Sequence, residues 1–535
     1  MLVDSVRHAY FYLLTVQYVI LLPVFLYFVR PGSRGSAIGF PRFSMRWIVV
    51  PFLAMAAITS WYVAQGITVP DESAYRFQAR IFASGHLWAD APPGAGFRIS
   101  EIPPPLYFEH IILSGQKWYS QLPPLWPAVL APALKLHAEW LMSPVFGALL
   151  LAISAATSRL IFGDYKTGTA VALLMALSPY YLTNCIGIMT HAFCGALIAG
   201  AIYLCFKGLR SRRLIDFAGM FALLSLACVA RYFTGAVVAA VLGLVTLWCL
   251  RRDRVLVVRT ALLGMLFAVL ILAAILVYNR TYTGRYLVSP YAVVQDSTLP
   301  FYRSPQLVFS PRVIWENILH DRRWGAQRTL FYTTPFLFLL AGYGVVRERR
   351  FTTEVRILAL LSVCLVAAYQ LEIENSAAIN GERYYFEVFG AVAILAARGL
   401  TLLVQTWRIP LKHVAIALAA LAGLQICENG MAIYGLVSRT AEQRQIRRAA
   451  GRLTNTKRAA FLSQTLPFPP KHFFLNGPDW RSADLMFMVD PGPAGRQDWA
   501  CRMGRSQWVA YGYDESARSV SEEFGSTASG GCPGL

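Results

Sequence analysis

Long hydrophobic runs, separated by short polar stretches, recur along the chain as far as residue 434 or so. Each run is roughly 17 to 25 residues long, the length that an α-helix needs to cross a bilayer core about 30 Å thick. The pattern therefore predicts a polytopic, all-helical membrane bundle. We expect spans at roughly 9–28, 47–65, 139–161, 167–182, 187–206, 214–230, 233–250, 259–278, 331–347, 355–371, 384–404 and 411–434.

The composition agrees with this pattern. Of the 535 residues, 56% are hydrophobic and only 15% are charged, whereas a soluble domain carries about 25% charged residues. The net charge of +20 would suggest a nucleic-acid partner in a soluble protein. Here the basic residues lie in short loops between hydrophobic runs, so we expect the bilayer and no nucleic acid as the partner.

The basic loops orient the chain. Four loops, at 29–46, 207–213, 251–259 and 347–356, each hold four arginine or lysine residues. With twelve spans all four fall on one side of the membrane, which the positive-inside rule identifies as cytoplasmic. The span at 9–28 is either an extra helix or a signal-like segment.

Three longer segments then lie outside the cytoplasm, at 66–138, 279–330 and 435–535. The chain divides into an extra N-terminal span and cytoplasmic loop (1–46), a membrane domain (47–434) and a tail. The first outside segment is rich in acids where the cytoplasmic loops are basic. These acids are Asp71, Glu72, Asp90, Glu101 and Glu109.

The tail predicts a small α/β domain outside the cytoplasm. Short strand-like runs at 458–462, 484–489 and 507–511 are separated by turn-forming proline and glycine, over about 80 residues. Cys501 and Cys532 also lie in the tail. In an oxidising compartment they could form a disulfide, although the last dozen residues have the composition of a flexible end.

The first outside segment begins with a predicted helix. Pro70 favours a turn, Asp71 can cap a helix that runs to about Ser84, and Gly85 can end it. Arg76 and Arg80 are four residues apart and form a polar face, opposite an apolar face of Phe77, Ile81 and Phe82. We expect this helix to lie in the membrane interface, with the arginines toward lipid phosphates. A second short helix is expected at about 124–136.

The order of the motifs resembles a known family. An Asp71-Glu72 pair follows an early span, then an interfacial helix, then Tyr119-Ser-Gln121 and a Pro-Pro-Leu-Trp-Pro stretch. This resembles the membrane glycosyltransferases of the GT-C fold, notably bacterial relatives of the protein O-mannosyltransferases and of the lipid A aminoarabinose transferase. Similar motifs recur in order over roughly 45–405, at 178–181, 190–191, 230–234, 278–284 and 381–387.

The resemblance implies a function. Such enzymes move a sugar from a polyprenyl-phosphate donor to an acceptor outside the cytoplasm, with inversion at the sugar carbon. The acceptor would be a cell-envelope glycan, a lipid or a protein. The protein would reside in a bacterial inner (plasma) membrane, with its active site facing the periplasm.

The resemblance also implies roles for particular residues. Asp71 would be the catalytic base, and Glu72 would orient it or bind the acceptor. Spacing alone favours a role for Asp71 as a helix cap only, and it is the resemblance that favours the base. Arg383, Arg231 and Lys117 are the candidates that would stabilise the departing lipid phosphate, although each could simply snorkel or anchor at the interface. Further substrate-binding candidates are Tyr119, Gln121, His191, Tyr282, Glu382 and Tyr384.

The sequence does not decide whether the protein binds a cofactor. A divalent metal held by Asp71 and His191 is one possibility, and a hydrogen-bonded packing histidine is the alternative. The sequence contains no HExxH or CxxC metal motif. Two other functions compete with catalysis: a transporter or flippase of lipid-linked sugars, and a non-catalytic membrane scaffold. A transporter should have paired halves with broken spans, which the sequence lacks, and a scaffold leaves the Asp71-Glu72 pair unexplained.

Overall fold

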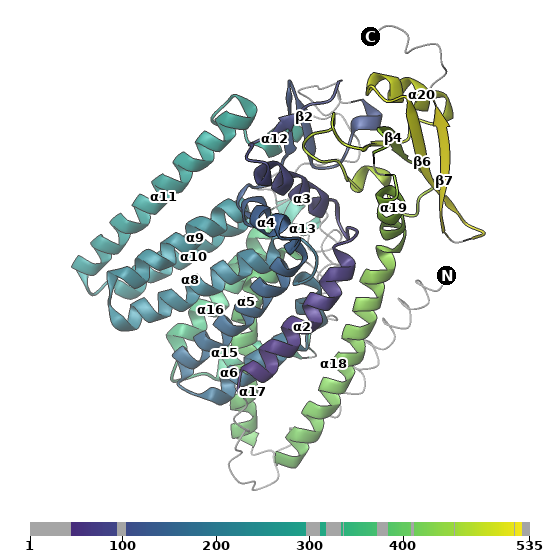
Figure 1. The fold of residues 1–535 in the computed structure, drawn as a ribbon. Helices are drawn as coiled ribbons and strands as arrows, with labels where there is room; N and C mark the ends of the chain where they lie inside the picture. The colour runs from purple at the N-terminus through teal and green to yellow at the C-terminus, as the bar shows by residue number, and fades with distance from the viewer. Residues whose placement is uncertain are drawn as a thin grey trace.

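The computed structural model describes residues 44–93, 103–295, 311–316, 333–334, 336–371, 383–407, 411–453, 455–517 and 519–526. The span predicted at 9–28, Glu382 and Cys532 lie outside the described residues. Within them, a bundle of helices carries a small α/β domain at one end (Figure 1).

The bundle confirms the predicted polytopic membrane architecture. Seven helical segments of the described chain are long and apolar enough to cross a membrane, and two shorter apolar helices, α9 (Leu214–Ala230) and α15 (Leu337–Arg347), accompany them. The seven are α2 (Arg46–Val63), α5 (Glu139–Phe162), α8 (His191–Ser211), α10 (Tyr232–Leu250), α11 (Arg254–Thr283), α16 (Thr352–Tyr369) and α17 (Phe389–Trp407) together with the 3-10 turn η4 (Arg383–Val388) before it. The helix α18 (Leu411–Arg439) leads from the bundle to the tail.

The predicted span at 167–182 is wrong. The chain there forms α6 (Tyr165–Ala176), which has 12 residues, and then a separate helix α7 (Pro179–Asn184). Pro179 occupies the first turn of α7, and the residue before a proline avoids the helical conformation. The apolar run is therefore broken at Ser178, whose hydroxyl accepts from the backbone N–H of Tyr181.

The helix α11 is longer than the predicted 259–278 because its capping residues, and not the limits of the apolar run, set its ends. The side chain of Asp253 accepts a hydrogen bond from Leu256 N at the start, and Gly284 ends the helix at a φ of +77°. Only 6% of the residues in its apolar stretch are buried inside the protein. In Figure 1 the helix stands at one side of the bundle. Its surface is that of a lipid-facing helix.

The first outside segment folds over one end of the bundle. It contains α3 (Pro70–Ala83), the 3-10 turn η2 (Pro104–Leu106) and α4 (Leu125–Lys135). The helix α4 confirms the predicted helix at about 124–136. A three-stranded antiparallel sheet with the order β1-β3-β2 lies between them. Its strands, which the sequence analysis did not predict, are β1 (Ala89–Asp90), β2 (Ile111–Ser114) and β3 (Lys117–Ser120). Two short helices, α12 (Pro290–Gln295) and α13 (Pro311–Glu316), follow α11.

The prediction that α3 directs its arginines toward lipid is wrong. Arg76 is only 4% exposed, and its guanidinium donates to the carbonyl of Ala64. Arg80 Nη1 donates to the carbonyls of Leu475 and Asn476 in the tail, at 2.9 and 3.1 Å. Because the tail covers α3, this polar face lies inside the protein. Gly85, with a φ of +83°, does follow the end of the helix as predicted.

The tail is the predicted α/β domain. After α19 (Ala441–Gly451) its four strands are β4 (Arg458–Leu462), β5 (Leu485–Val489), β6 (Gln507–Asp514) and β7 (Ser519–Ser526), with the 3-10 turn η5 (Pro470–His472) and α20 (Pro493–Arg502) between them. The sheet order is β5-β4-β6-β7, parallel except for the antiparallel β7. Cys501 is disulfide-bonded.

An aromatic cluster attaches the tail to the first outside segment. The ring of Phe474 lies 4.8 Å from those of Phe77 and Phe108 and 5.2 Å from that of Trp118. Aromatic pairs in such tilted or edge-on geometry contribute roughly 0.5–1.5 kcal/mol each beyond area burial. The tail is therefore packed against α3 and β3 and does not hang from a linker.

Close backbone packing of α15 against α17 generates a prediction. A Cβ atom added to Gly344 would lie 2.5 Å from the carbonyl oxygen of Leu395, whereas one added to Gly342 would meet nothing within 4 Å. We expect Gly344→Ala to destabilise the protein by about 1–3 kcal/mol, because the backbones must separate. Gly342→Ala, on the same helix, should be neutral or slightly stabilising. Unfolding of detergent-purified protein in a denaturant titration measures both, and equal midpoints would contradict the packing.

Candidate active site

The local sequence around Pro70 decides where Asp71 lies. Val69 is the extended N-cap of α3 and Pro70 is the first helical residue, so Asp71 occupies the first turn and is not the N-cap. The expectation that Asp71 caps this helix is therefore wrong. A carboxylate in the first turn is still favoured by the positive end of the helix dipole.

Arg383 is the charged partner of Asp71. The two residues are 312 positions apart, and Nη1 of Arg383 lies 3.4 Å from Oδ2 of Asp71. Their side chains are 14% and 16% exposed. Burial alone raises the pKa of the Asp71 carboxyl, but the charges of Arg383 and His110, with smaller contributions, outweigh it and lower the pKa to about 2. Asp71 is thus ionised at neutral pH and held by a cation.

A second set of ionisable groups lies at the other end of η4. Nδ1 of His191 and Nε of Arg231 both approach Oε1 of Glu387, at 2.9 and 3.1 Å. His191 opens α8, and Arg231 sits at the extended junction between α9 and α10. The Glu387 side chain is fully buried. His191 and Arg231 were predicted as site residues from the sequence, whereas Glu387 was not, although it lies four residues after Arg383 in the same motif.

Tyr384 connects the two sets. The guanidinium carbons of Arg231 and Arg383 lie 5.1 and 5.3 Å from the centre of its ring, within the range of cation–π attraction. Tyr369, also missed by the sequence analysis, stacks on Tyr384 at 5.0 Å with an interplanar angle of 9°. Its hydroxyl accepts from Nη2 of Arg231 at 3.3 Å. The structure therefore brings Asp71, Arg383, Tyr384, Arg231 and His191 together.

Glu72 has a different environment from Asp71. Its Oε2 accepts from the backbone N–H of Thr68 at 2.6 Å, and its Oε1 accepts from that of Ile188 at 2.9 Å. A Cβ atom at Gly187 would lie 2.2 Å from Oε1, so this contact requires glycine. Burial raises the pKa of Glu72 despite the hydrogen bonds. Glu72 fastens the loop before α3 to the loop before α8, which makes it a positioning residue for Asp71.

Three other candidates lie at the outer end of α11. Lys117 Nζ donates to the carbonyl of Thr281 at 2.6 Å and lies 4.2 Å from the centre of the Trp88 ring. The Tyr282 hydroxyl donates to the carbonyl of Leu87 at 2.5 Å, and its ring meets that of Tyr119 at 4.9 Å. These contacts join α11 to the small sheet, and none of them involves Asp71 or Arg383.

Gln121 does reach the site, through His110. Nε2 of Gln121 lies 2.5 Å from Nδ1 of His110, and the backbone N–H of Gln121 donates to the His110 carbonyl at 3.0 Å. The charge of His110 is one of those that lower the pKa of Asp71. Gln121 therefore positions a neighbour of the candidate base.

The described residues do not favour the divalent metal that the sequence left open at Asp71 and His191. It contains no group of three His, Cys, Asp or Glu side chains that could hold an ion. Nε2 of His191 lies 3.5 Å from Nη1 of Arg231, and this guanidinium would repel a divalent cation at that position. We derive no step through a metal.

The comparisons with known proteins concern the fold. No family model matches the chain, and no curated protein matches it. ArnT from Cupriavidus metallidurans in the apo state matches with a TM-score of 0.51 at 14% identity, over 88% of this chain and 93% of that one. ArnT from the same organism bound to undecaprenyl phosphate has a TM-score of 0.49 at 14% identity, over 81% and 84%. The oligosaccharyltransferase of Archaeoglobus fulgidus has a TM-score of 0.47 at 14% identity, over 72% of this chain and 56% of that one.

The match to apo ArnT confirms the fold that the motif order implied. This chain and ArnT share one fold along nearly their full lengths, and the resemblance to GT-C membrane glycosyltransferases is confirmed at that level. An identity of 14% carries no substrate or residue role from one protein to the other. Those must be argued from the site itself.

The buried pairing of Glu387 generates a prediction. Glu387→Gln should destabilise the folded protein by about 3–5 kcal/mol, because it leaves Arg231 without its counter-charge. A matched control is Glu522→Gln in the tail, which removes a pair with Arg452, a side chain that is 67% exposed. We expect less than about 1 kcal/mol there. Denaturant titration of both purified variants measures the free energy of unfolding. Similar losses would show that the Glu387 pair stabilises the protein no more than an exposed pair does.

Proposed function

We propose that this protein is an inverting membrane glycosyltransferase. It moves a sugar from a polyprenyl-phosphate donor to a hydroxyl- or amine-bearing acceptor outside the cytoplasm. Asp71 is the catalytic base, and Arg383 and Arg231 bind the donor phosphate. The protein acts in a bacterial inner membrane, with this site facing the periplasm.

One observation carries the proposal: Asp71 and Arg383 form a partly buried pair, and Tyr384 links that pair to Arg231. Transfer from a lipid phosphate needs a carboxylate that takes a proton and cations that stabilise the leaving phosphate. Both kinds of group lie together in a fold shared with a membrane transferase. A scaffold has no need for such a cluster, whose buried charges are costly.

The proposed step balances as follows. The acceptor oxygen or nitrogen attacks the anomeric carbon from the face opposite the phosphate and forms the new glycosidic bond. The bond between that carbon and the phosphate oxygen breaks, and its electron pair leaves with the lipid phosphate. Asp71 takes the proton from the acceptor, while Arg383 and Arg231 offset the charge that the phosphate gains.

Arg383 has two partners in this scheme, and they compete. While it pairs with Asp71, the pKa of the carboxyl is about 2, which makes a poor base at neutral pH. A donor phosphate that engages Arg383 neutralises this charge, and burial then raises the pKa of Asp71. Donor binding thus increases the basicity of Asp71 when a proton must be taken.

The first prediction of this function concerns Asp71. Asp71→Asn should lower sugar transfer roughly 10²- to 10⁴-fold, because the amide cannot accept the proton, while folding is retained. The control is Asp90→Asn in the same outside segment, whose carboxylate is 72% exposed and pairs with Arg481. Lipid-phosphate release by purified protein from a panel of polyprenyl-phosphate sugars measures both.

The outcomes separate the rival functions. Release by wild type and by Asp90→Asn, but not by Asp71→Asn, supports the proposal and identifies the donor. Equal release by all three proteins would leave a transferase but exclude Asp71 as its base. A folded wild type that binds lipid-linked sugars without releasing lipid phosphate would contradict catalysis and favour the flippase.

The second prediction concerns Arg383. Arg383→Gln removes the largest charge that lowers the pKa of Asp71, so the pKa rises. Asp71 acts only when deprotonated, so the acidic limb of kcat/KM against pH should move to higher pH. Arg383→Lys keeps a cation, and its normalised profile should stay near that of wild type. An unmoved limb in Arg383→Gln, with release still measurable, would exclude electrostatic control of the base.

A further inference from the structure

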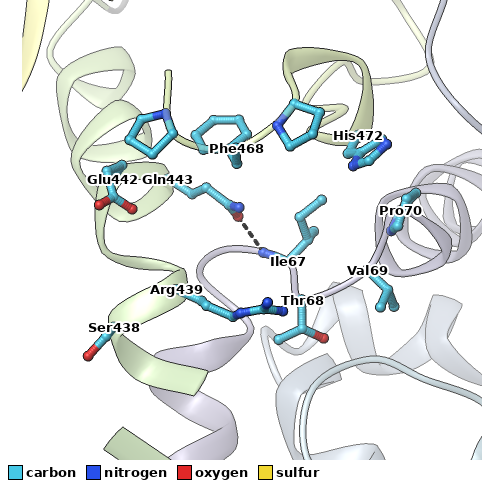
Figure 2. A pocket seen from close by; sticks show the side chains of 12 residues that line it. Ile67, Thr68, Val69, Pro70, Ser438, Arg439, Glu442, Gln443, Phe468 and His472 are labelled. Atoms are coloured by element: carbon cyan, nitrogen blue, oxygen red, sulfur yellow. Dashed lines mark hydrogen bonds between the residues drawn. The ribbon is translucent and has the colours of Figure 1, made fainter. Parts of the chain in front are cut away.

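A cavity of about 420 Å³ lies beside the start of α3, where three parts of the chain meet. The loop from Ile67 to Pro70 forms one side, the α18–α19 junction from Ser438 to Gln443 forms the second, and the tail loop from Pro467 to His472 forms the third. Figure 2 shows the three sides with their side chains around the cavity. Its volume is in the range of small-molecule sites, about 300–1,000 Å³.

The walls combine two kinds of surface. Phe468, between Pro467 and Pro469, supplies a flat apolar wall on the tail side. Arg439, Glu442, Ser438 and His472 supply a cation, a carboxylate, a hydroxyl and an imidazole. A saccharide has this same combination, with an apolar C–H face on each ring and hydroxyl groups around the rim. The ring face can lie against the aromatic side chain, and charged groups bind hydroxyls through strong hydrogen bonds.

The cavity is held in shape by bonds between its walls. Oε1 of Gln443 accepts from the backbone N–H of Ile67 at 2.6 Å, drawn as the dashed line in Figure 2. Nε2 of His472 lies 2.6 Å from Oε2 of Glu109, and the backbone N–H of Glu109 donates to the Lys471 carbonyl at 3.0 Å. The tail loop is therefore fastened to the first outside segment, and the site is preorganised before a ligand arrives.

The cavity also lies next to the proposed base. Pro70 lines it, and Asp71 is the next residue, about 3.8 Å away between Cα atoms. We propose that this cavity binds a saccharide portion of the acceptor, next to the unit whose hydroxyl or amine reaches Asp71. The inference rests on the proposed function and adds to it: the acceptor is a glycan or glycolipid, and the tail domain selects it.

The test uses purified full-length protein and measures the donor and acceptor sides separately. The donor side is the Kd for a polyprenyl-phosphate sugar, measured in the absence of acceptor. The acceptor side is incorporation of labelled sugar into a total glycolipid extract of a bacterial envelope, with a serine- and threonine-containing peptide library as the competing class. Two variants probe opposite walls: Phe468→Ala and Glu442→Gln. The matched control is Phe524→Ala, an exposed phenylalanine of the same domain outside the cavity.

We expect each wall variant to raise the half-saturating amount of glycolipid, on the order of 10-fold for Phe468→Ala, while the Kd for the donor stays unchanged. Phe524→Ala should match wild type on both sides. Glu442→Gln is nearly isosteric, so it tests the site even if Phe468→Ala unfolds, which a thermal melt reveals.

Three results would overturn the inference while leaving the transferase intact. They are an unchanged glycolipid requirement in the wall variants, label that enters only the peptides, and label that enters neither class although lipid phosphate is released. The absence of lipid-phosphate release by wild type with every donor would instead contradict the proposed function, and the inference with it.

Discussion

The end of the bundle that carries the candidate site depends on how one buried cation is neutralised. Arg231 lies at the junction of two membrane helices, where an unpaired charge would cost several kcal/mol, and Glu387 approaches it to 3.1 Å. Glu387 also meets His191, so the pairing joins the α9–α10 junction, the start of α8 and η4. Because η4 begins with Arg383 and Tyr384, neutralising Arg231 also sets the position of the groups that face Asp71. The stability of the bundle and the geometry of the site therefore have the same origin.

The tail fixes the helix on which Asp71 lies. Arg80 on α3 is bound by tail carbonyls, and Phe474 packs among rings of the first outside segment. Helix α3 is thus fixed between the bundle and the tail. Glu72 adds a third attachment through Thr68 and Ile188. Glu72 holds the end of α3 where Asp71 lies, and the tail contacts hold the rest of the helix. Asp71 therefore has the fixed position that its proposed role as a general base requires.

Sequence patterns predicted the helices and strands, which depend on residues close together in the chain. The expected span 233–250 corresponds to α10, Tyr232–Leu250, and the expected strand 458–462 is β4. Amphipathicity was misleading at Arg76 and Arg80, because a polar helix face that packs against protein carbonyls looks the same in sequence as one that faces lipid headgroups. Contacts between residues far apart in the chain could not be predicted from sequence patterns: Glu387 is 196 residues from His191. Asp71 and Arg383 were each predicted as site residues from the family resemblance, but their pairing was not.

That pairing bears on when Asp71 would become active in the proposed reaction. In this chain the cation that would bind the phosphate is the same one that holds the pKa of Asp71 at about 2. In the proposed mechanism, Asp71 is therefore a weak base until a phosphate competes for Arg383. A carboxylate buried without a cation would have a raised pKa at all times, so the competition between Asp71 and phosphate for one guanidinium links proton transfer to occupancy of the donor site.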